Sequence, residues 1–177
     1  MNARGSLALT AYAASITAAN YLTTRYGMVP VGFGLTTTAG TFAAGAALLC
    51  RDVVQDALGR AWVLAGIATG AALTLVTSPA LAAASAASFL VAECADMTVY
   101  TPLRSRGWAK AVIASNTVGA IVDTLLFLFL AGFPITASTV GGQLAGKLAW
   151  ATLLPVAAVV AVRQVRRGHV SRHPVGA

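Results

Sequence analysis

The chain is poor in charged residues, and above all in negative ones. Charged residues make up 10% of its 177 residues, against about 25% in an average soluble domain, and only five of them are carboxylates. With 58% hydrophobic residues and a mean hydropathy of +0.78, this composition excludes an ordinary soluble domain. Cys50 and Cys94 stand alone in apolar segments, and His169 and His173 have no acid or cysteine nearby. We therefore expect neither a metal nor a cofactor.

What the chain does contain is long apolar sequence. Six stretches are long enough to cross a bilayer, which takes about 17–25 apolar residues for each helix. They use most of the chain, so we predict an all-α, polytopic membrane protein with six transmembrane helices and one domain, residues 1–177. The Ser78-Pro79 loop is so short that the third and fourth helices must form an antiparallel hairpin. The expected helices cover about residues 6–24, 29–49, 61–77, 80–100, 111–131 and 144–162, and a basic cytoplasmic tail, residues 163–177, follows.

The basic residues are distributed unevenly between the loops. If the N-terminus is cytoplasmic, ten of the twelve fall on the cytoplasmic side, and only Arg25 and Lys147 fall outside. This bias is the positive-inside rule, and it predicts two cytoplasmic termini in a multi-pass protein of the cell membrane. Because topology and anionic lipid headgroups explain the net charge of +7, we expect the lipid bilayer as a partner and no nucleic acid. The ten are Arg4, Arg51, Arg60, Arg104, Arg106, Lys110, Arg163, Arg166, Arg167 and Arg172.

The second apolar stretch has an unusual beginning. Pro30, Gly32 and Gly34 are followed by three threonines, residues 36–38, and by Gly40. Glycine and proline at this density loosen a helix, and interrupted helices in transporters free backbone groups to bind substrate. A shorter helix preceded by an irregular outer loop explains the pattern equally well. Both interpretations stay open at the level of the sequence.

All five carboxylates lie in or beside the most apolar stretches. An ionisable group at the bilayer centre costs about 2.5–3.5 kcal/mol on insertion scales, so such residues usually face a functional cavity. Glu93, Asp96 and Tyr100 share one face of the fourth expected helix, and Asn116 and Asp123 share one face of the fifth. Because a short loop joins these helices, we expect a pocket at about mid-depth with up to three carboxylates and one amide.

Such a pocket suits a flat ligand that is rich in N–H groups. One carboxylate can accept both the ring N–H and the exocyclic NH2 of a guanine-like edge, and a cationic amine or a proton would also suit it. Phe89 and Phe127, one turn along these faces, could stack on the ligand. In a purely structural alternative, the acids pair with Lys147, with Arg51 or with each other to hold the bundle together.

Other polar residues leave two interpretations open. Lys147 either reaches the outer headgroups or neutralises the pocket, and Asn20 either binds substrate or bonds a neighbouring helix. Asp52 and Asp56 lie among arginines at the cytoplasmic end of the second helix, where ion pairs are weak. Our candidates for substrate binding are Glu93, Asp96, Asn116, Asp123, Asn20 and Lys147, supported by Asp52, Phe89, Tyr100 and Phe127.

A series of motifs runs through the expected helices from the first to the sixth. It comprises Asn20, the turn Ala39-Gly40-Thr41, the run Asp52-Val-Val-Gln-Asp56-Ala-Leu58-Gly59-Arg60, the acidic Glu93-Cys-Ala-Asp96, Ser115-Asn116 with Asp123 and Phe127, and Lys147 with Pro155. In this order the motifs resemble the queuosine precursor transporter family, also called the VUT family of vitamin uptake transporters. At Asp56, Leu58 and Arg60 the chain departs from that family, which has Glu, Tyr and Lys.

The resemblance implies a transporter, and not an enzyme, that imports 7-deazaguanine bases such as 7-cyano-7-deazaguanine for nucleic-acid modification. The pocket expected from the residues suits the edge of such a base. Transport could be driven by a proton carried on Glu93, Asp96 or Asp123, since burial favours a protonated carboxyl, or it could be facilitated diffusion. A homo-oligomer is compatible with the sequence, which does not fix the exact substrate.

Two other classes of protein are alternatives. The first is the substrate-binding subunit of an energy-coupling-factor vitamin importer, a small six-helix protein that needs a separate ATPase. The second is an integral-membrane enzyme of lipid-phosphotransferase type, because Asp52 and Asp56 superficially resemble the metal-binding helix of CDP-alcohol phosphotransferases. Those enzymes need further aspartates on the next helix, and the third apolar stretch has no acid.

Overall fold

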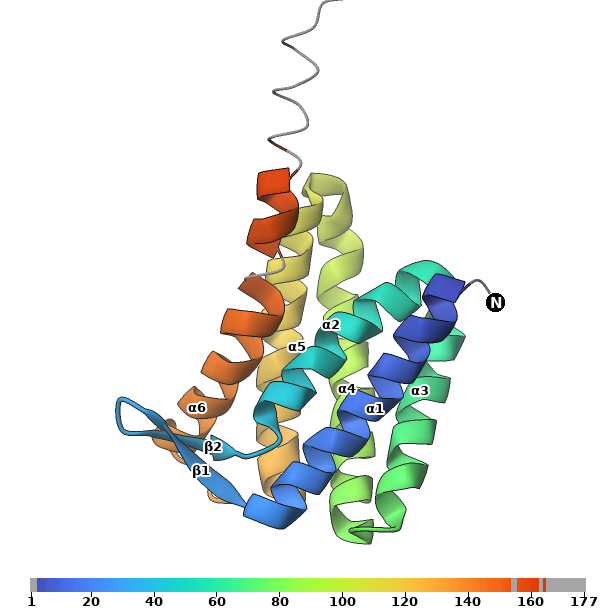
Figure 1. Cartoon of the computed structure of the whole chain (residues 1–177). Helices are drawn as coiled ribbons and strands as arrows, with labels where there is room; N and C mark the ends of the chain where they lie inside the picture. The colour runs from blue at the N-terminus through green and yellow to red at the C-terminus, as the bar shows by residue number, and fades with distance from the viewer. Residues whose placement is uncertain (1–2, 154–155, 163, 165–177) are drawn as a thin grey trace, which may run out of the picture.

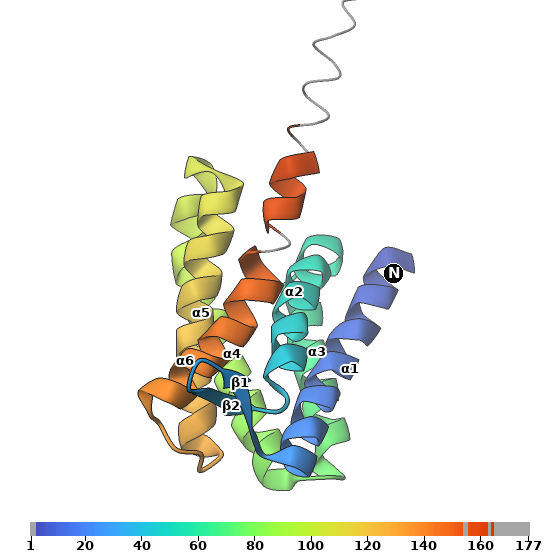
Figure 2. The ribbon, with the colours of Figure 1, turned by 60° about the vertical axis from the view of Figure 1, so that its left-hand side comes forward.

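The computed structural model describes residues 3–153, 156–162 and 164. The predicted tail, residues 163–177, lies outside the described residues except for Gln164, and so does Pro155. The described elements form a helical bundle with one β-hairpin (Figures 1 and 2). They are α1 (Ala3–Tyr26), β1 (Met28–Gly32), β2 (Leu35–Thr38), α2 (Thr41–Leu58), α3 (Arg60–Leu75), α4 (Pro79–Leu103), the 3-10 turn η1 (Arg104–Arg106), α5 (Trp108–Leu130), α6 (Ala137–Leu148) and the π-helical turn η2 (Ala149–Leu153).

Successive helices run in opposite directions along the bundle (Figure 1). The start of α1, the α2–α3 junction and η1 lie at one end, which we call the N-terminal end. The β-hairpin and the α3–α4 connection lie at the other, which we call the hairpin end. The predicted antiparallel pair of third and fourth helices is present (Figure 1). The turn between them is short because Ser78 caps α4, accepting a 3.3 Å hydrogen bond from the Leu81 amide, and Pro79 is the first residue of the helix.

Two helices in the described part of the chain are long and apolar enough to cross a membrane. They are α4 together with η1, residues Pro79–Arg106, and α5, Trp108–Leu130. Helix α3 is apolar but shorter, at 16 residues. The structure therefore supports membrane-spanning helices at the fourth and fifth predicted positions. Six spans and two cytoplasmic termini stay predictions.

The second predicted helix, residues 29–49, is wrong in its first half. Residues 28–38 form an antiparallel hairpin in which Val29 pairs with Thr37, and the helix begins only at Thr41. The chain reverses at Gly32 and Gly34, whose φ angles are +89° and +73°. Glycine adopts such positive φ angles readily because it has no Cβ. The all-α prediction is wrong for this segment. The structure excludes an interrupted helix here and shows the shorter helix, preceded by an ordered hairpin.

The hairpin packs against α6 (Figure 2). Ser138 Oγ donates a 2.7 Å hydrogen bond to the Gly34 carbonyl, and Gln143 Nε2 donates a 3.3 Å hydrogen bond to Thr38 Oγ1. Gly142 faces the Thr36 carbonyl so closely that a Cβ there would overlap it. The non-helical backbone is therefore held against protein, which is the arrangement that a membrane protein requires.

The sixth helix begins earlier than the predicted residue 144. A capping box places its start at Ala137: the Thr139 amide donates to Thr136 Oγ1 at 3.1 Å, and the Thr136 amide donates to Thr139 Oγ1 at 2.9 Å. The regular helix then ends at Leu148, where the π-helical turn follows. Because Gln143 lies inside the helix, four residues before Lys147, the two side chains share its buried face.

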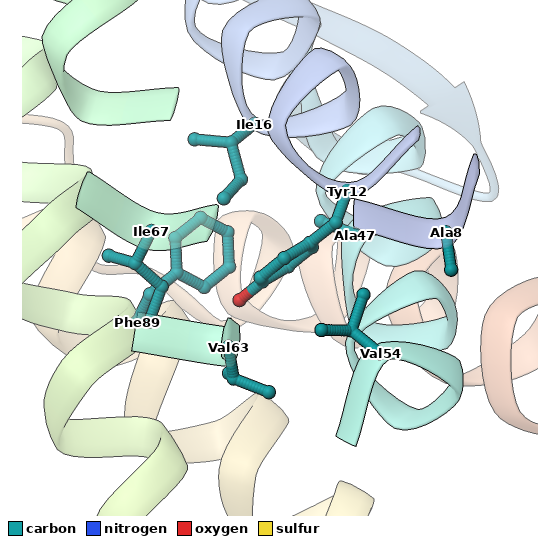
Figure 3. Packing of buried hydrophobic residues seen from close by; sticks show 8 residues of the cluster. All are labelled: Ala8, Tyr12, Ile16, Ala47, Val54, Val63, Ile67 and Phe89. Atoms are coloured by element: carbon teal, nitrogen blue, oxygen red, sulfur yellow. The ribbon is translucent and has the colours of Figure 1, made fainter. Parts of the chain in front are cut away.

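The apolar core lies among α1, α2, α3 and α4 (Figure 3). Tyr12 is 1% exposed and packs at its centre. Two glycines of α3 bring α1 close, because a Cβ at Gly66 would lie 2.5 Å from Tyr12 Cδ1 and one at Gly70 would lie 2.7 Å from Ile16 Cβ. The cluster comprises Ala8, Tyr12, Ile16, Ala47, Val54, Val63, Ile67 and Phe89.

Candidate functional site

The predicted acids form two separate clusters along the bundle. Glu93 and Asp96 of α4 gather with Asn116 around an arginine of α2, whereas Asp123 of α5 pairs with Lys147 of α6. The faces of α4 and α5 meet as their spacing predicts, and these two helices pack against each other along their length. Each cluster contains a buried cation, so the structural alternative of ion pairing is present at both.

The first cluster surrounds Lys147, which is 2% exposed. Its Nζ donates hydrogen bonds to Asp123 Oδ2 at 2.8 Å, to Gln143 Oε1 at 2.8 Å and to Thr124 Oγ1 at 3.0 Å. All three ammonium protons can thus be satisfied inside the protein. Lys147 neutralises the pocket and does not reach the outer headgroups. We call these four residues the Lys147 cluster.

The second cluster surrounds Arg51, which is 5% exposed although the sequence placed it in a cytoplasmic loop region. Its guanidinium donates to Glu93 Oε2 at 2.7 Å, to Asp52 Oδ1 at 2.6 Å and to Asn116 Oδ1 at 3.2 Å. Asp96 Oδ2 lies 3.4 Å from Nη2, within ion-pair distance. We call these five residues the Arg51 cluster.

Two carboxylate oxygens of the Arg51 cluster are buried and accept no hydrogen bond from the described residues. They are Oε1 of Glu93 and Oδ1 of Asp96, and both residues are 5% exposed. Buried acceptors normally have a partner, because an unsatisfied one loses its hydration without compensation. The two oxygens are therefore free to bind a proton or a donor group.

A small cavity adjoins the Lys147 cluster and takes residues from α1, α2, α4, α5 and α6. Its volume of about 20 Å³ is enough for about one water molecule. Asn20 of α1 lines the cavity and donates a 3.3 Å hydrogen bond to Thr74 Oγ1. Phe89 of α4 and Phe127 of α5 also line it. We call this the Phe127 cavity, and Asp123, Gln143 and Lys147 form part of its polar lining.

Two more cavities follow towards the N-terminal end. A cavity of about 10 Å³ is lined by Tyr12, Arg51, Phe89, Glu93, Asp96 and Asn116, and we call it the middle cavity. A larger one of about 380 Å³ is lined in part by Asp52, Tyr100, Arg104 and Trp108, and we call it the vestibule. Its lining includes the exposed side chains of Asp56, Arg60 and Arg104, so it opens at the N-terminal end.

The three cavities share residues and form one line through the bundle. Phe89 belongs to both the Phe127 cavity and the middle cavity. Arg51, Asp96 and Asn116 belong to both the middle cavity and the vestibule. The line follows the seam where α1 and α2 face α4 and α5.

The line also includes residues that were not among the candidates from the sequence, and Arg51, Gln143 and Tyr12 are three of them. Arg51 was recognisable, because it lies three residues after Leu48 and three before Val54 and so shares the apolar face of α2. Gln143 was assigned to a loop. Tyr12 has no charged residue within four positions in sequence that would mark it.

Gly141, Gly146 and Lys147 have the spacing of the Gly-x-x-x-x-Gly-Lys phosphate loop. A phosphate loop needs these residues in an irregular turn that precedes a helix, with Ser or Thr after the lysine. Here they lie inside α6, Leu148 follows, and the lysine is bonded to Asp123. The spacing therefore makes no nucleotide site.

Comparison with protein families matches residues 7–162 to the family described as "Putative vitamin uptake transporter". The chain belongs to this family. The match runs from α1 through α6 and includes both clusters and all three cavities. A vitamin uptake transporter is a membrane protein that moves a small molecule, and the family is one of transporters. Searches of the curated proteins and of the solved structures found no significant match.

Proposed function

We propose that this vitamin uptake transporter imports a 7-deazaguanine base, such as 7-cyano-7-deazaguanine, across the cell membrane as a multi-pass protein. The single observation that carries the proposal is the make-up of the Phe127 cavity. It combines one carboxylate, Asp123, with two buried amides, Asn20 and Gln143, and two phenylalanine rings. The order of motifs that resembles queuosine precursor transporters supports the same substrate.

These side chains match the chemistry of a deazaguanine. Its ring N–H and exocyclic NH2 are adjacent donors that one carboxylate can accept together, and Asp123 is the carboxylate of this cavity. The amides of Asn20 and Gln143 can donate to the ring carbonyl or accept from the ring. Hydrogen bonds to a charged group contribute about 1.5–3 kcal/mol each, and stacking on Phe89 or Phe127 adds about 0.5–1.5 kcal/mol.

The described conformation is a closed one with respect to this substrate. A cavity of about 20 Å³ holds about one water molecule, whereas ligand pockets usually measure about 300–1,000 Å³. Binding therefore requires the helices to separate along the seam. It also requires the base to share Asp123 with Lys147, so substrate binding and the α5–α6 contact compete for one carboxylate.

The orientation in the membrane follows from the basic residues. Arg60, Arg104, Arg106 and Lys110 are exposed around the N-terminal end, whereas Arg25 lies at the end of α1 beside the hairpin. By the positive-inside rule, this distribution supports our proposal that the N-terminal end faces the cytoplasm. In this orientation the vestibule faces the cytoplasm, and the imported base leaves through it.

The test is complementation of uptake. The chain is expressed in a bacterium that cannot make 7-deazaguanines and lacks its own importer, precursor base is supplied, and queuosine is measured in tRNA. We expect restored queuosine with the natural chain and with Thr117→Val, a half-buried position on the same helix as Asp123 whose hydroxyl donates to the Ile113 carbonyl. We expect none with Asp123→Asn. Absence of queuosine with the natural chain in the membrane would refute the proposed substrate.

A further inference from the structure

The Arg51 cluster contains more negative charge than positive. Glu93 and Asp96 are each 5% exposed and face a single cation, Arg51. A third carboxylate, Asp52, also pairs with this guanidinium, and its side chain is 34% exposed. In the Lys147 cluster, by contrast, one lysine faces one aspartate. The buried part of the Arg51 cluster thus has one carboxylate too many for its cation.

The excess negative charge is located at two carboxylate oxygens that have no hydrogen-bond donor within the described part of the chain. Arg51 bonds Oε2 of Glu93 and approaches Oδ2 of Asp96, which leaves Oε1 and Oδ1 without a donor among the described residues. A buried carboxylate keeps its charge only when its oxygens are paired or hydrogen-bonded, and otherwise it binds a proton. Two neighbouring acids with one shared cation favour the state in which one of them is protonated.

Among the described residues, the groups that face this pair offer no second cation. Helix α1 contributes Tyr12, α2 contributes Arg51 and Asp52, and α5 contributes the neutral Asn116. On α4 itself the other titratable groups are the exposed thiol of Cys94 and Tyr100 in the vestibule. From α3 and α6 no described residue lines the middle cavity, and Lys147 of α6 is bonded to Asp123.

The size of the cavity beside Glu93 and Asp96 limits which cation could neutralise their excess negative charge. The middle cavity measures about 10 Å³, the lower limit for a single water molecule. A metal ion would need several oxygen ligands around it, and the cavity offers two free carboxylate oxygens, Glu93 Oε1 and Asp96 Oδ1. A proton needs only one of them. The geometry therefore favours a proton over a sodium ion.

We propose that the Glu93–Asp96 pair holds one proton, and that this proton is the coupling ion that drives import. The second part of this inference, that the proton drives import, rests on the proposed function. The pair lies between the Phe127 cavity, with which the middle cavity shares Phe89, and the vestibule, with which it shares Arg51 and Asp96. A proton that enters with the base from the hairpin end can leave to the vestibule, and the proton gradient across the membrane supplies the energy.

The first test requires no substrate. Infrared spectroscopy of the purified full chain in lipid nanodiscs detects the carbonyl stretch of a protonated carboxyl group at neutral pH. We expect this band in the natural chain, and we expect it to be lost or shifted in Glu93→Gln and Asp96→Asn. Asp56→Asn, at an exposed carboxylate, should leave it unchanged. Absence of the band from the natural chain, or its persistence in both variants, would overturn the proposal.

The second test measures coupling. Proteoliposomes containing the natural chain take up 7-cyano-7-deazaguanine under an inward proton gradient, under an inward sodium gradient, or with no gradient. We expect at least tenfold greater accumulation under the proton gradient only, and loss of this difference in Glu93→Gln. Thr98→Val, an exposed position on the same helix, should behave like the natural chain.

The outcomes separate the two proposals. An infrared band that the variants remove, without uptake of the base, would refute the substrate and keep the protonated pair. Uptake that responds to sodium, or to no gradient at all, would refute the proton as coupling ion and keep the substrate.

Discussion

Nζ of Lys147 lies 2.8 Å from Oδ2 of Asp123, and both side chains are almost fully buried between α5 and α6. A buried ion pair contributes little net stability compared with a well-packed apolar pair, but removal of one partner leaves an uncompensated charge. In this transporter the pair also borders the proposed substrate cavity. Its energetics therefore connect the stability of the bundle to substrate binding.

The first prediction concerns this pair. Lys147→Gln leaves Asp123 buried without its cation, and we expect a loss of about 3–5 kcal/mol in the free energy of unfolding. The double variant Lys147→Gln with Asp123→Asn removes both charges and should recover most of that loss. Denaturation of the purified proteins in detergent measures both. Equal stability of the single and the double variant would show that the charges are not coupled. Lys110→Gln, at an exposed lysine, is the control.

The second prediction concerns the guanidinium of Arg51. Arg51→Lys keeps the charge but cannot bond Glu93, Asp52 and Asn116 at once, because a lysine offers no planar fork. We expect uptake of the base to fall at least tenfold. Arg60→Lys, at an exposed arginine where the resembling family has lysine, should retain uptake. A normal rate in Arg51→Lys would mean that only the charge of residue 51 matters.

The third prediction uses two adjacent glycines of α6. A Cβ at Gly142 would overlap the carbonyl of Thr36 in β2, whereas a Cβ at Gly141 would lie 3.2 Å from the flexible end of Leu35. We expect Gly142→Ala to lower the free energy of unfolding by about 1–3 kcal/mol because it forces the hairpin away. Gly141→Ala should be tolerated, since alanine favours the helix by about 1 kcal/mol. Similar unfolding curves for both variants would contradict the docking of β2 on α6.

The fourth prediction concerns stacking in the Phe127 cavity. Phe127→Leu keeps an apolar side chain but removes the ring, and the loss of about 0.5–1.5 kcal/mol should raise the KM for the base about two- to thirteenfold. Phe129→Leu, two residues along and 70% exposed, is the control on the same helix and should leave the KM unchanged. Initial uptake rates over a range of base concentrations give both values. An unchanged KM in Phe127→Leu would place the ring outside the substrate site.

Helical packing and the position of most acids could be predicted from sequence because both depend on local periodicity. Glu93 and Asp96 share a buried face of α4, as their spacing requires, and Asp123 is buried on α5. The tight α3–α4 connection followed from a two-residue loop. The predicted substrate-binding roles of these residues stay predictions.

What sequence could not supply was the partner of each acid. Whether Arg51 lies in a loop or in the bundle depends on where α2 begins, and that depends on the hairpin before it. The hairpin was hidden because Pro30, Gly32 and Gly34 interrupt an otherwise apolar stretch, and this pattern suits an interrupted helix as well as a turn. Likewise, Gln143 shares the buried face of Lys147 because the helix already begins after its N-cap, Thr136. The apolar stretch from which the helix was predicted begins more than one turn later. These relationships are tertiary, since they depend on contacts between distant segments.

The measurement that tests the central claim most directly is counterflow exchange in proteoliposomes. Vesicles containing the purified chain are loaded with unlabelled 7-cyano-7-deazaguanine and diluted into the labelled base, so that exchange needs no ion gradient and is independent of the coupling proposal. We predict rapid entry of label with the natural chain and with Thr117→Val, and none with Asp123→Asn. Entry no faster than in empty vesicles with the natural chain would contradict the account.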